Sequence, residues 1–237
     1  MTDLHTHILP GMDDGARDAD ESIMMLRQEQ AQGVDTVVLT PHFYRDRETS
    51  EQFLQRRAES FEKLKLRLCE LPPEERQALP RLVLGVEAAW HHTLLDWERI
   101  DQLCIGQTKY LLLEMPFTPW TGHTINLIYD LMGHTDIVPV IAHLERYMNS
   151  QSAGRIQEIL EMGIPVQVSA DIFRHPLVWH KAITMLRRNQ IHLLGSDCHD
   201  VHDRPPNLKA AVDIARRVLG DRRTEELIRC SDKLVGL

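Results

Sequence analysis

A short apolar run that ends in a polar residue, followed by an amphipathic stretch of helical period, recurs about seven times along this chain. The runs span residues 3–7, 34–42, 81–88, 110–116, 137–143, 165–171 and 191–199. Most are nearly continuous in Val, Ile and Leu, which is typical of parallel strands covered on both faces. Such alternation predicts either an open doubly wound sheet or a closed barrel, and polar residues at the strand ends favour the barrel.

The chain reads as one α/β domain over residues 1–237, because no second composition regime or low-complexity tract interrupts it. Asp18 and Glu21 resemble a capping box at the start of a helix, and Gly33 stands where that helix would end. The proline-containing segment 71–80 reads as a charged surface loop rather than a linker between domains.

Charge and cysteine usage narrow the class of protein. Neither a signal peptide nor an apolar stretch of membrane-spanning length is evident, so we expect a cytoplasmic protein that is not embedded in a membrane. Cys69, Cys104, Cys198 and Cys230 are scattered, which argues against disulfides and against a thiolate zinc site. A formal net charge of -8 gives no general attraction for nucleic acid.

His5 and His7 lie two residues apart on an expected strand, so both imidazoles point to one face and can bind one metal ion. The carboxyl ends of parallel barrel strands meet at one rim, where residues distant in sequence become neighbours. Further ligand-type residues lie at the ends of the runs or in the turn after the first: Asp14, His42, Glu87, Glu114, His143, Asp197 and His199.

Each of these residues has a simpler structural explanation to be weighed against metal binding. Asp14 precedes a glycine and, taken alone, would more often form a turn. Glu87 and Glu114 lie inside apolar runs, where a carboxylate without a partner is costly to bury, so the simpler explanation fails for them. We therefore predict that all nine residues form one metal cluster.

Nine ligands of histidine and carboxylate type are too many for one ion, so two or three divalent ions are predicted. Three ions with four carboxylates would leave a positive site that favours phosphate, and a water bridging the metals would be the nucleophile. Arg146 and Arg204 follow His143 and His199 closely, and their guanidinium groups could reach the phosphate oxygens.

These residues resemble the polymerase and histidinol phosphatase (PHP) superfamily, which has the same ligand pattern in the same order. The strings that carry the resemblance are DLHTH, TPH ending at His42, and SDCH containing Asp197 and His199. Three longer strings, HILPGMDDG, AHLERY and SDCHDVHDRPP, look like the bacterial manganese-dependent protein-tyrosine phosphatases of capsular and exopolysaccharide biosynthesis.

The resemblance implies a distorted (β/α)7 barrel and phosphate contacts by Arg146 and Arg204. It implies Mn²⁺ as the metal, with Fe, Zn, Co or Mg left open, and a phosphotyrosine-bearing protein as the substrate, such as the C-terminal tail of a bacterial tyrosine kinase. The implied ligand sets are His5, His7, Glu87 and Asp197 for one ion, Glu87, Glu114 and His143 for a second, and Asp14, His42 and His199 for a third.

Several alternatives remain at this point. The same site could act on a small phosphomonoester such as histidinol phosphate or on a nucleotide, or the barrel could be a non-catalytic metal-binding partner. Cys198 and Arg204 also form Cys-x5-Arg, the spacing of cysteine-dependent tyrosine phosphatases, but the intervening acidic residues would repel phosphate. Residues 43–80, with Arg45 and Arg47, are expected to shape the substrate entrance. The oligomeric state stays open, a homo-oligomer included.

Overall fold

The computed structural model describes residues 1–174 and 179–236, and each of the seven predicted runs contains a strand. The second and third runs each contain two short strands rather than one. The strands are β1 (Thr2–Thr6), β2 (Thr36–Leu39), β3 (His42–Phe43), β4 (Arg81–Leu84), β5 (Glu87–Ala89), β6 (Tyr110–Glu114), β7 (Val138–Ile141), β8 (Gln167–Ser169) and β9 (Leu193–Gly195).

The seven runs pair in sequence order into a closed ring of parallel strands. Three hydrogen-bonded sheets follow one another, with strand orders β1-β2-β4, β3-β5-β6-β7 and β8-β9. A parallel bridge between Ile141 and Val166 joins β7 to the run that contains β8. A second parallel bridge, between Thr6 and Cys198, joins the end of the last run back to β1. The predicted α/β class and the distorted seven-run barrel are therefore confirmed.

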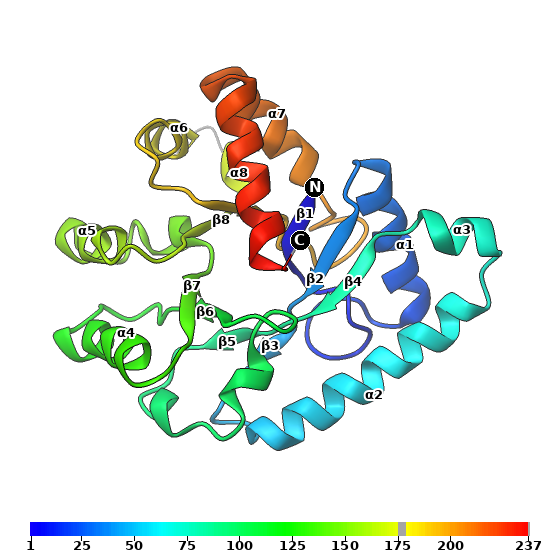
Figure 1. Ribbon diagram of the computed structural model, residues 1–237, viewed down its shortest axis with the longest axis horizontal. Coiled ribbons are helices and arrows are strands. Elements are labelled where there is room, and N and C mark those ends of the chain that lie inside the picture. Colours follow the sequence, from blue (N-terminus) through cyan, green and yellow to red (C-terminus); the bar gives the residue numbers. More distant parts are fainter. Residues whose placement is uncertain (175–178, 237) are drawn as a thin grey trace.

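Helices surround the ring of strands (Figure 1). The α-helices are α1 (Ala19–Ala31), α2 (Ser50–Cys69), α3 (Pro73–Ala78), α4 (Gly122–His134), α5 (Ala153–Glu161), α6 (Trp179–Arg187), α7 (Leu208–Leu219) and α8 (Asp221–Leu234). Asp18 caps α1 by accepting a hydrogen bond from the backbone of Glu21, as predicted. Within the described ranges, no helix combines the length and the apolar character needed to cross a membrane.

Two expectations about the connections were wrong. Residues 71–80 contain the helix α3, which begins at Pro73, where the missing N–H of proline costs no helical hydrogen bond. Between β5 and β6 the described chain has no α-helix but two short 3₁₀ helices, η1 (Leu94–Asp96) and η2 (Ile100–Leu103). Arg99 separates them in the left-handed backbone region, so a continuous helix cannot form there.

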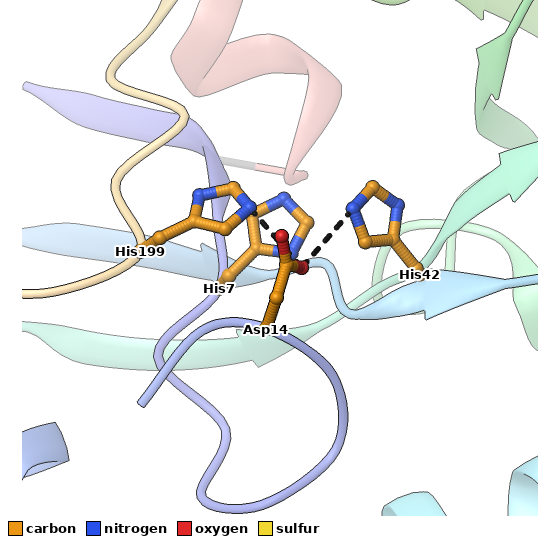
Figure 2. Close-up of side chains that lie close together, drawn as sticks. All are labelled: His7, Asp14, His42 and His199. Atoms are coloured by element: carbon orange, nitrogen blue, oxygen red, sulfur yellow. Dashed lines mark ion pairs between the residues drawn. The ribbon is translucent and has the colours of Figure 1, made fainter. Parts of the chain in front are cut away.

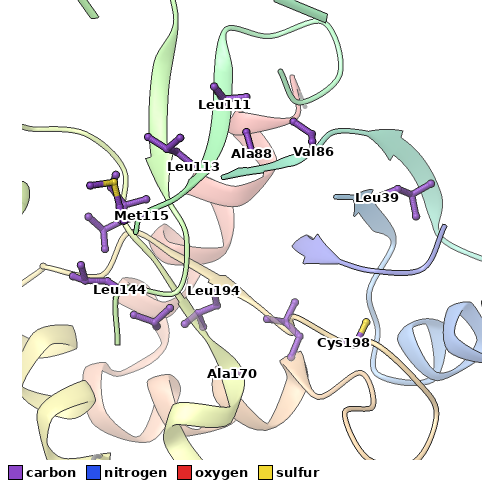
Figure 3. Close-up of a cluster of buried hydrophobic side chains, with 14 of the residues drawn as sticks. Leu39, Val86, Ala88, Leu111, Leu113, Met115, Leu144, Ala170, Leu194 and Cys198 are labelled. Atoms are coloured by element: carbon purple, nitrogen blue, oxygen red, sulfur yellow. The ribbon is translucent and has the colours of Figure 1, made fainter. Parts of the chain in front are cut away.

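The apolar strands bury their side chains on both faces. In β6, Leu111 and Leu113 belong to the large cluster between strands and helices, part of which is drawn in Figure 3. Leu112 belongs to a smaller cluster with residues from other strands and with Leu234 and Val235 at the end of α8. Glu114 ends the strand two residues after Leu112, on the same face. The alternation in this strand therefore directs Glu114 toward the inside of the ring.

One histidine outside the rim ties two strands together and makes stability depend on pH. The Nδ1 atom of His192 accepts a hydrogen bond of 3.2 Å from the backbone N–H of Val166, and burial lowers the pKa of this histidine. As the pH falls, His192 takes up a proton in the unfolded chain, where its pKa is about 6.5, before it does so in the folded protein. The free energy of unfolding therefore decreases as the pH falls below that value. We expect His192→Asn to lose less stability than wild type between about pH 7.5 and pH 5.5 in urea unfolding. Equal losses in the two proteins would contradict this role.

Candidate metal centre

The first histidine pair lies at the end of β1 and is fully buried. The Nε2 atoms of His5 and His7 lie 3.2 Å apart. The Oε2 atom of Glu87 lies 3.2 Å from Nε2 of His5 and 3.3 Å from Nε2 of His7. Oδ1 of Asp197 lies 3.6 and 3.5 Å from the same two nitrogen atoms. Two imidazoles and two carboxylates from three separate runs thus converge on one point.

Glu87 connects this group to a second one. Its Oε1 atom lies 2.6 Å from Nε2 of His143, and that nitrogen lies 3.7 Å from Oε1 of Glu114. His42 approaches from the other side, with Nδ1 at 3.0 Å from Oε2 of Glu87. Ligand-type atoms of His42, Glu87 and Glu114 all lie within 4.8 Å of one another.

The third group lies around Asp14, in the turn after β1 (Figure 2). Its Oδ1 atom lies 3.5 Å from Nε2 of His42 and 3.5 Å from Nε2 of His199. The His199 ring stacks on the His7 ring with centroids 3.9 Å apart, which links this group to the first one. All nine residues predicted from the sequence therefore lie in one connected cluster at the carboxyl ends of the strands.

The chemistry of these contacts suits bound cations. Three imidazole nitrogens, from His5, His7 and His42, lie within 3.3 Å of the single atom Oε2 of Glu87. That atom is buried and has no hydrogen-bond partner among the described residues, and neither has Nε2 of His199. Burial and the neighbouring charge of Glu87 raise the pKa of Glu114 to about 7. A cation would satisfy these lone pairs and relieve the repulsion between the carboxylates.

Hydrogen bonds on the far side of the rings orient the imidazoles. Nδ1 of His7 lies 2.8 Å from Oδ2 of Asp13, and Nδ1 of His199 lies 3.0 Å from the backbone oxygen of Asp197. Nδ1 of His5 lies 3.4 Å from Oε1 of Gln167. With Nδ1 engaged as a donor, each ring presents the lone pair of Nε2 to the cluster, as a metal ligand must.

Asp13 and Gln167 were not predicted as site residues. Asp13 also accepts hydrogen bonds from the backbones of His42 and Gly15. Burial would raise its pKa, but His7 and these hydrogen bonds together lower it, so Asp13 stays ionised. Gln167 accepts a 2.6 Å hydrogen bond from the backbone of His143. The only sequence signal for Asp13 is its place in the Asp-Asp-Gly turn, from which we predict Asp14 as the ligand.

Both predicted arginines lie beside one carboxylate of the cluster. Nη2 of Arg204 lies 3.0 Å from Oδ2 of Asp197, and Arg146 donates a hydrogen bond to the same oxygen. About a third of each arginine side chain remains exposed. Asp197 and His143 both adopt positive φ, a strained conformation that is concentrated at functional sites. The guanidinium groups therefore lie at the edge of the cluster, where they can also meet a ligand.

The Cys-x5-Arg spacing does not form a phosphate-binding loop. Cys198 is fully buried, and burial together with Glu29 and Asp3 raises the pKa of its thiol well above the ordinary value, so no thiolate forms. The backbone N–H groups of residues 202, 203 and 204 donate to the carboxylate of Asp200. A phosphate would find these donors already engaged and a negative charge beside them.

Known proteins are similar to this chain in both sequence and fold. A family model described as capsular polysaccharide synthesis, CpsB/CapC, matches residues 1–235. The tyrosine-protein phosphatase CpsB of Streptococcus pneumoniae is 30% identical, over 96% of this chain and 94% of its own. The tyrosine-protein phosphatase YwqE of Bacillus subtilis is 31% identical, over 93% and 85% of the two chains.

A solved structure extends this likeness to three dimensions. It comes from crystal structures of YwqE from Bacillus subtilis and CpsB from Streptococcus pneumoniae, which are described as unique metal-dependent tyrosine phosphatases. The TM-score is 0.82 at 26% identity, over 99% of this chain and 94% of the other. The resemblance predicted from the ligand motifs is thereby confirmed. The chain belongs to the CpsB/CapC family of capsular polysaccharide synthesis.

Proposed function

We propose that this chain is a metal-dependent tyrosine phosphatase that hydrolyses phosphotyrosine in a protein, using divalent ions held by the nine-residue cluster. The observation that carries the proposal is the convergence of nine histidine and carboxylate side chains at one rim, beside two arginines. Its relatives in the family, CpsB and YwqE, are tyrosine-protein phosphatases. Nothing in this arrangement requires a protein nucleophile.

The ligands would divide among up to three ions. The first ion would be held by His5, His7, Glu87 and Asp197, the second by Glu87, Glu114 and His143, and the third by Asp14, His42 and His199. The contacts through Glu87 and through the stacked rings of His7 and His199 support adjacent ions, with Glu87 as the ligand that the first two would share. Oxygen and imidazole ligands suit Mn²⁺, the metal that we propose, and also accept Fe, Zn, Co or Mg.

Divalent ions supply two things when bound: they lower the pKa of water and they offset the charge of the transferred phosphoryl group. The residues of the chain bind and orient the substrate. Arg146 and Arg204 direct guanidinium N–H groups to the phosphate oxygens, in a geometry that a lysine could not match. Asp13 and Gln167 hold the imidazoles of His7 and His5 in the orientation that metal binding needs.

The substrate is a phosphotyrosine-bearing protein, such as the C-terminal tail of a bacterial tyrosine kinase that controls capsule or exopolysaccharide synthesis. The description of the family as one of capsular polysaccharide synthesis supports this setting. The protein acts in the cytoplasm, as a single domain over residues 1–237. The closed ring of seven runs and the family match over residues 1–235 support one domain.

Metal removal tests the proposal. Chelation followed by desalting is expected to lower kcat/KM on a phosphotyrosine peptide at least about 100-fold, because the ions supply several kcal/mol of transition-state stabilisation. Adding Mn²⁺ back should restore activity. Elemental analysis before and after chelation should give two or three ions per chain in the active protein.

A substrate panel gives the control. Phosphotyrosine peptide, histidinol phosphate and a nucleoside monophosphate are compared with the same Mn²⁺-loaded protein. A higher kcat/KM on either small phosphomonoester would exclude the tyrosine proposal while leaving the metal chemistry intact. Full metal loading with no turnover of any substrate would instead identify a metal-binding partner protein.

A further inference from the structure

A pocket of about 820 Å³ lies next to the metal centre, and nothing in the metal chemistry requires it. Its wall begins at Asp13 and His42, which belong to the centre or contact it, and continues over Tyr44 and Arg47 to the first turns of α2. Pockets that bind small ligands span about 300–1,000 Å³. A phosphotyrosine side chain alone would leave much of this pocket free, so the space suits the residues that flank it in a polypeptide.

At the far side of this pocket Glu48 and Arg56 are paired with each other, whereas the exposed Glu51 forms no ion pair with any residue that the structure describes. Arg56 binds Glu48 at 2.5 Å and donates a hydrogen bond of 2.7 Å to the backbone oxygen of Met12. These contacts fasten α2 to the turn that carries Asp13 and Asp14. They leave Arg56 with little freedom to meet a substrate.

Arg47 differs from Arg56. Its guanidinium lies over the ring of Tyr44, 4.3 Å from the ring centroid, and it forms no ion pair with any residue that the structure describes. The Tyr44 ring in turn lies 5.3 Å from the ring of His42. An exposed cation without an ion-pair partner among the described residues therefore lies against an aromatic ring, one side chain away from a candidate metal ligand.

We propose that this pocket is the binding site for the polypeptide around the phosphotyrosine, and that Arg47 selects substrates with an acidic residue close to the phosphotyrosine. The inference rests on the proposed phosphatase function and names the specificity of the same site. The phosphate binds at the metal centre, the flanking chain lies along Tyr44, and a Glu or Asp side chain pairs with the guanidinium of Arg47. Exposed ion pairs of this kind contribute to specificity more than to affinity.

The test uses a panel of phosphotyrosine peptides in which a single Glu is moved through the three positions on either side of the phosphotyrosine. Matched peptides with Gln or Lys at these positions, and free phosphotyrosine, are the comparison substrates. For the preferred Glu position, Arg47→Ala should lower kcat/KM about 5-fold, mainly through KM, and remove the preference for Glu over Gln. Free phosphotyrosine should change less than about 2-fold. Arg47→Glu should prefer the Lys peptide. Arg222→Ala, on the exposed face of α8, is the matched control and should behave as wild type.

Two outcomes would overturn the inference. An equal loss on free phosphotyrosine and on peptides would place Arg47 at the phosphate, and an unchanged peptide preference would place the flanking residues elsewhere. Binding of the preferred peptide with a non-hydrolysable phosphonate gives a readout independent of turnover, and Arg47→Ala should raise its Kd about 5-fold. Failure of the proposed function would differ, because wild type would then not turn over free phosphotyrosine with Mn²⁺.

Discussion

Asp197→Asn is expected to lower kcat/KM on phosphotyrosine at least about 1,000-fold, whereas Cys198→Ser should stay within about 3-fold of wild type. Asp197 contacts the nitrogens of His5 and His7 and both arginines, so neutralising it would remove a proposed metal ligand and release the guanidinium groups together. The neighbouring Cys198 is buried on the other side of the loop, where its thiol donates to Oε1 of Glu29. His199→Ala should resemble Asp197→Asn.

Metal content and folding provide the controls for this comparison. Both variants are first checked for a cooperative unfolding transition, and Cys198→Ala replaces Cys198→Ser if the serine hydroxyl destabilises the buried position. Metal content should fall in Asp197→Asn and should remain at the wild-type level in the Cys198 variant. A folded, metal-loaded Cys198 variant without activity would overturn the metal mechanism and revive the cysteine one.

The metal-ligand candidates could be predicted because two simple rules act together. Parallel strands bring their carboxyl ends to one rim, and a carboxylate inside an apolar run needs a partner. Glu114 satisfies both rules, since it ends the run of Leu111 to Leu113 and turns to the inside of the ring. No knowledge of the loop conformations was needed to place it.

The positions of other site residues depend on loop conformations that the local amino-acid sequence does not reveal. Asp13 and Asp14 are chemically identical and both precede Gly15, yet Asp13 holds the far side of His7 while Asp14 faces His42 and His199. Gln167 reads as one polar residue in a strand. Its contacts with His5 and His143 arise only when the ring closes and brings three distant runs together.

The pattern of apolar residues also could not predict that the second and third runs each divide into two strands. The run 34–42 is continuous in sequence, but its two strands belong to different sheets. Between them, the backbone N–H of Thr40 bonds to the oxygen of Thr6, and its side chain accepts from the backbone of Thr6. These bonds turn the chain so that His42 reaches Glu87. This turn depends on contacts between two runs, whereas the periodicity of apolar residues gives information only about the run in which they lie.

Gly15→Ala is expected to impair stability and the metal centre together. A Cβ atom at Gly15 would lie 2.1 Å from the backbone oxygen of His7 and 2.5 Å from the His7 Cβ atom. Backbone atoms at the end of a barrel strand cannot move aside, so the turn itself must shift, and with it Asp13 and Asp14. Overpacking of this kind costs about 1–3 kcal/mol or more, and each kcal/mol lowers Tm by roughly 2–4 °C in a domain of this size.

The matched control is Gly133→Ala, in the exposed last turn of α4, where an added Cβ meets no atom within 4 Å. There alanine removes the entropic cost of glycine in a helix, so Tm should stay constant or rise by a few degrees. Phosphatase activity should fall at least about 100-fold in Gly15→Ala, because a displacement of about 1 Å at a reacting centre is enough for such a loss. Thermal unfolding, elemental analysis and kcat/KM measure the three effects. An unchanged Tm with full metal content in Gly15→Ala would show that the turn can relax, and that its contact with His7 does not hold the ligands in place.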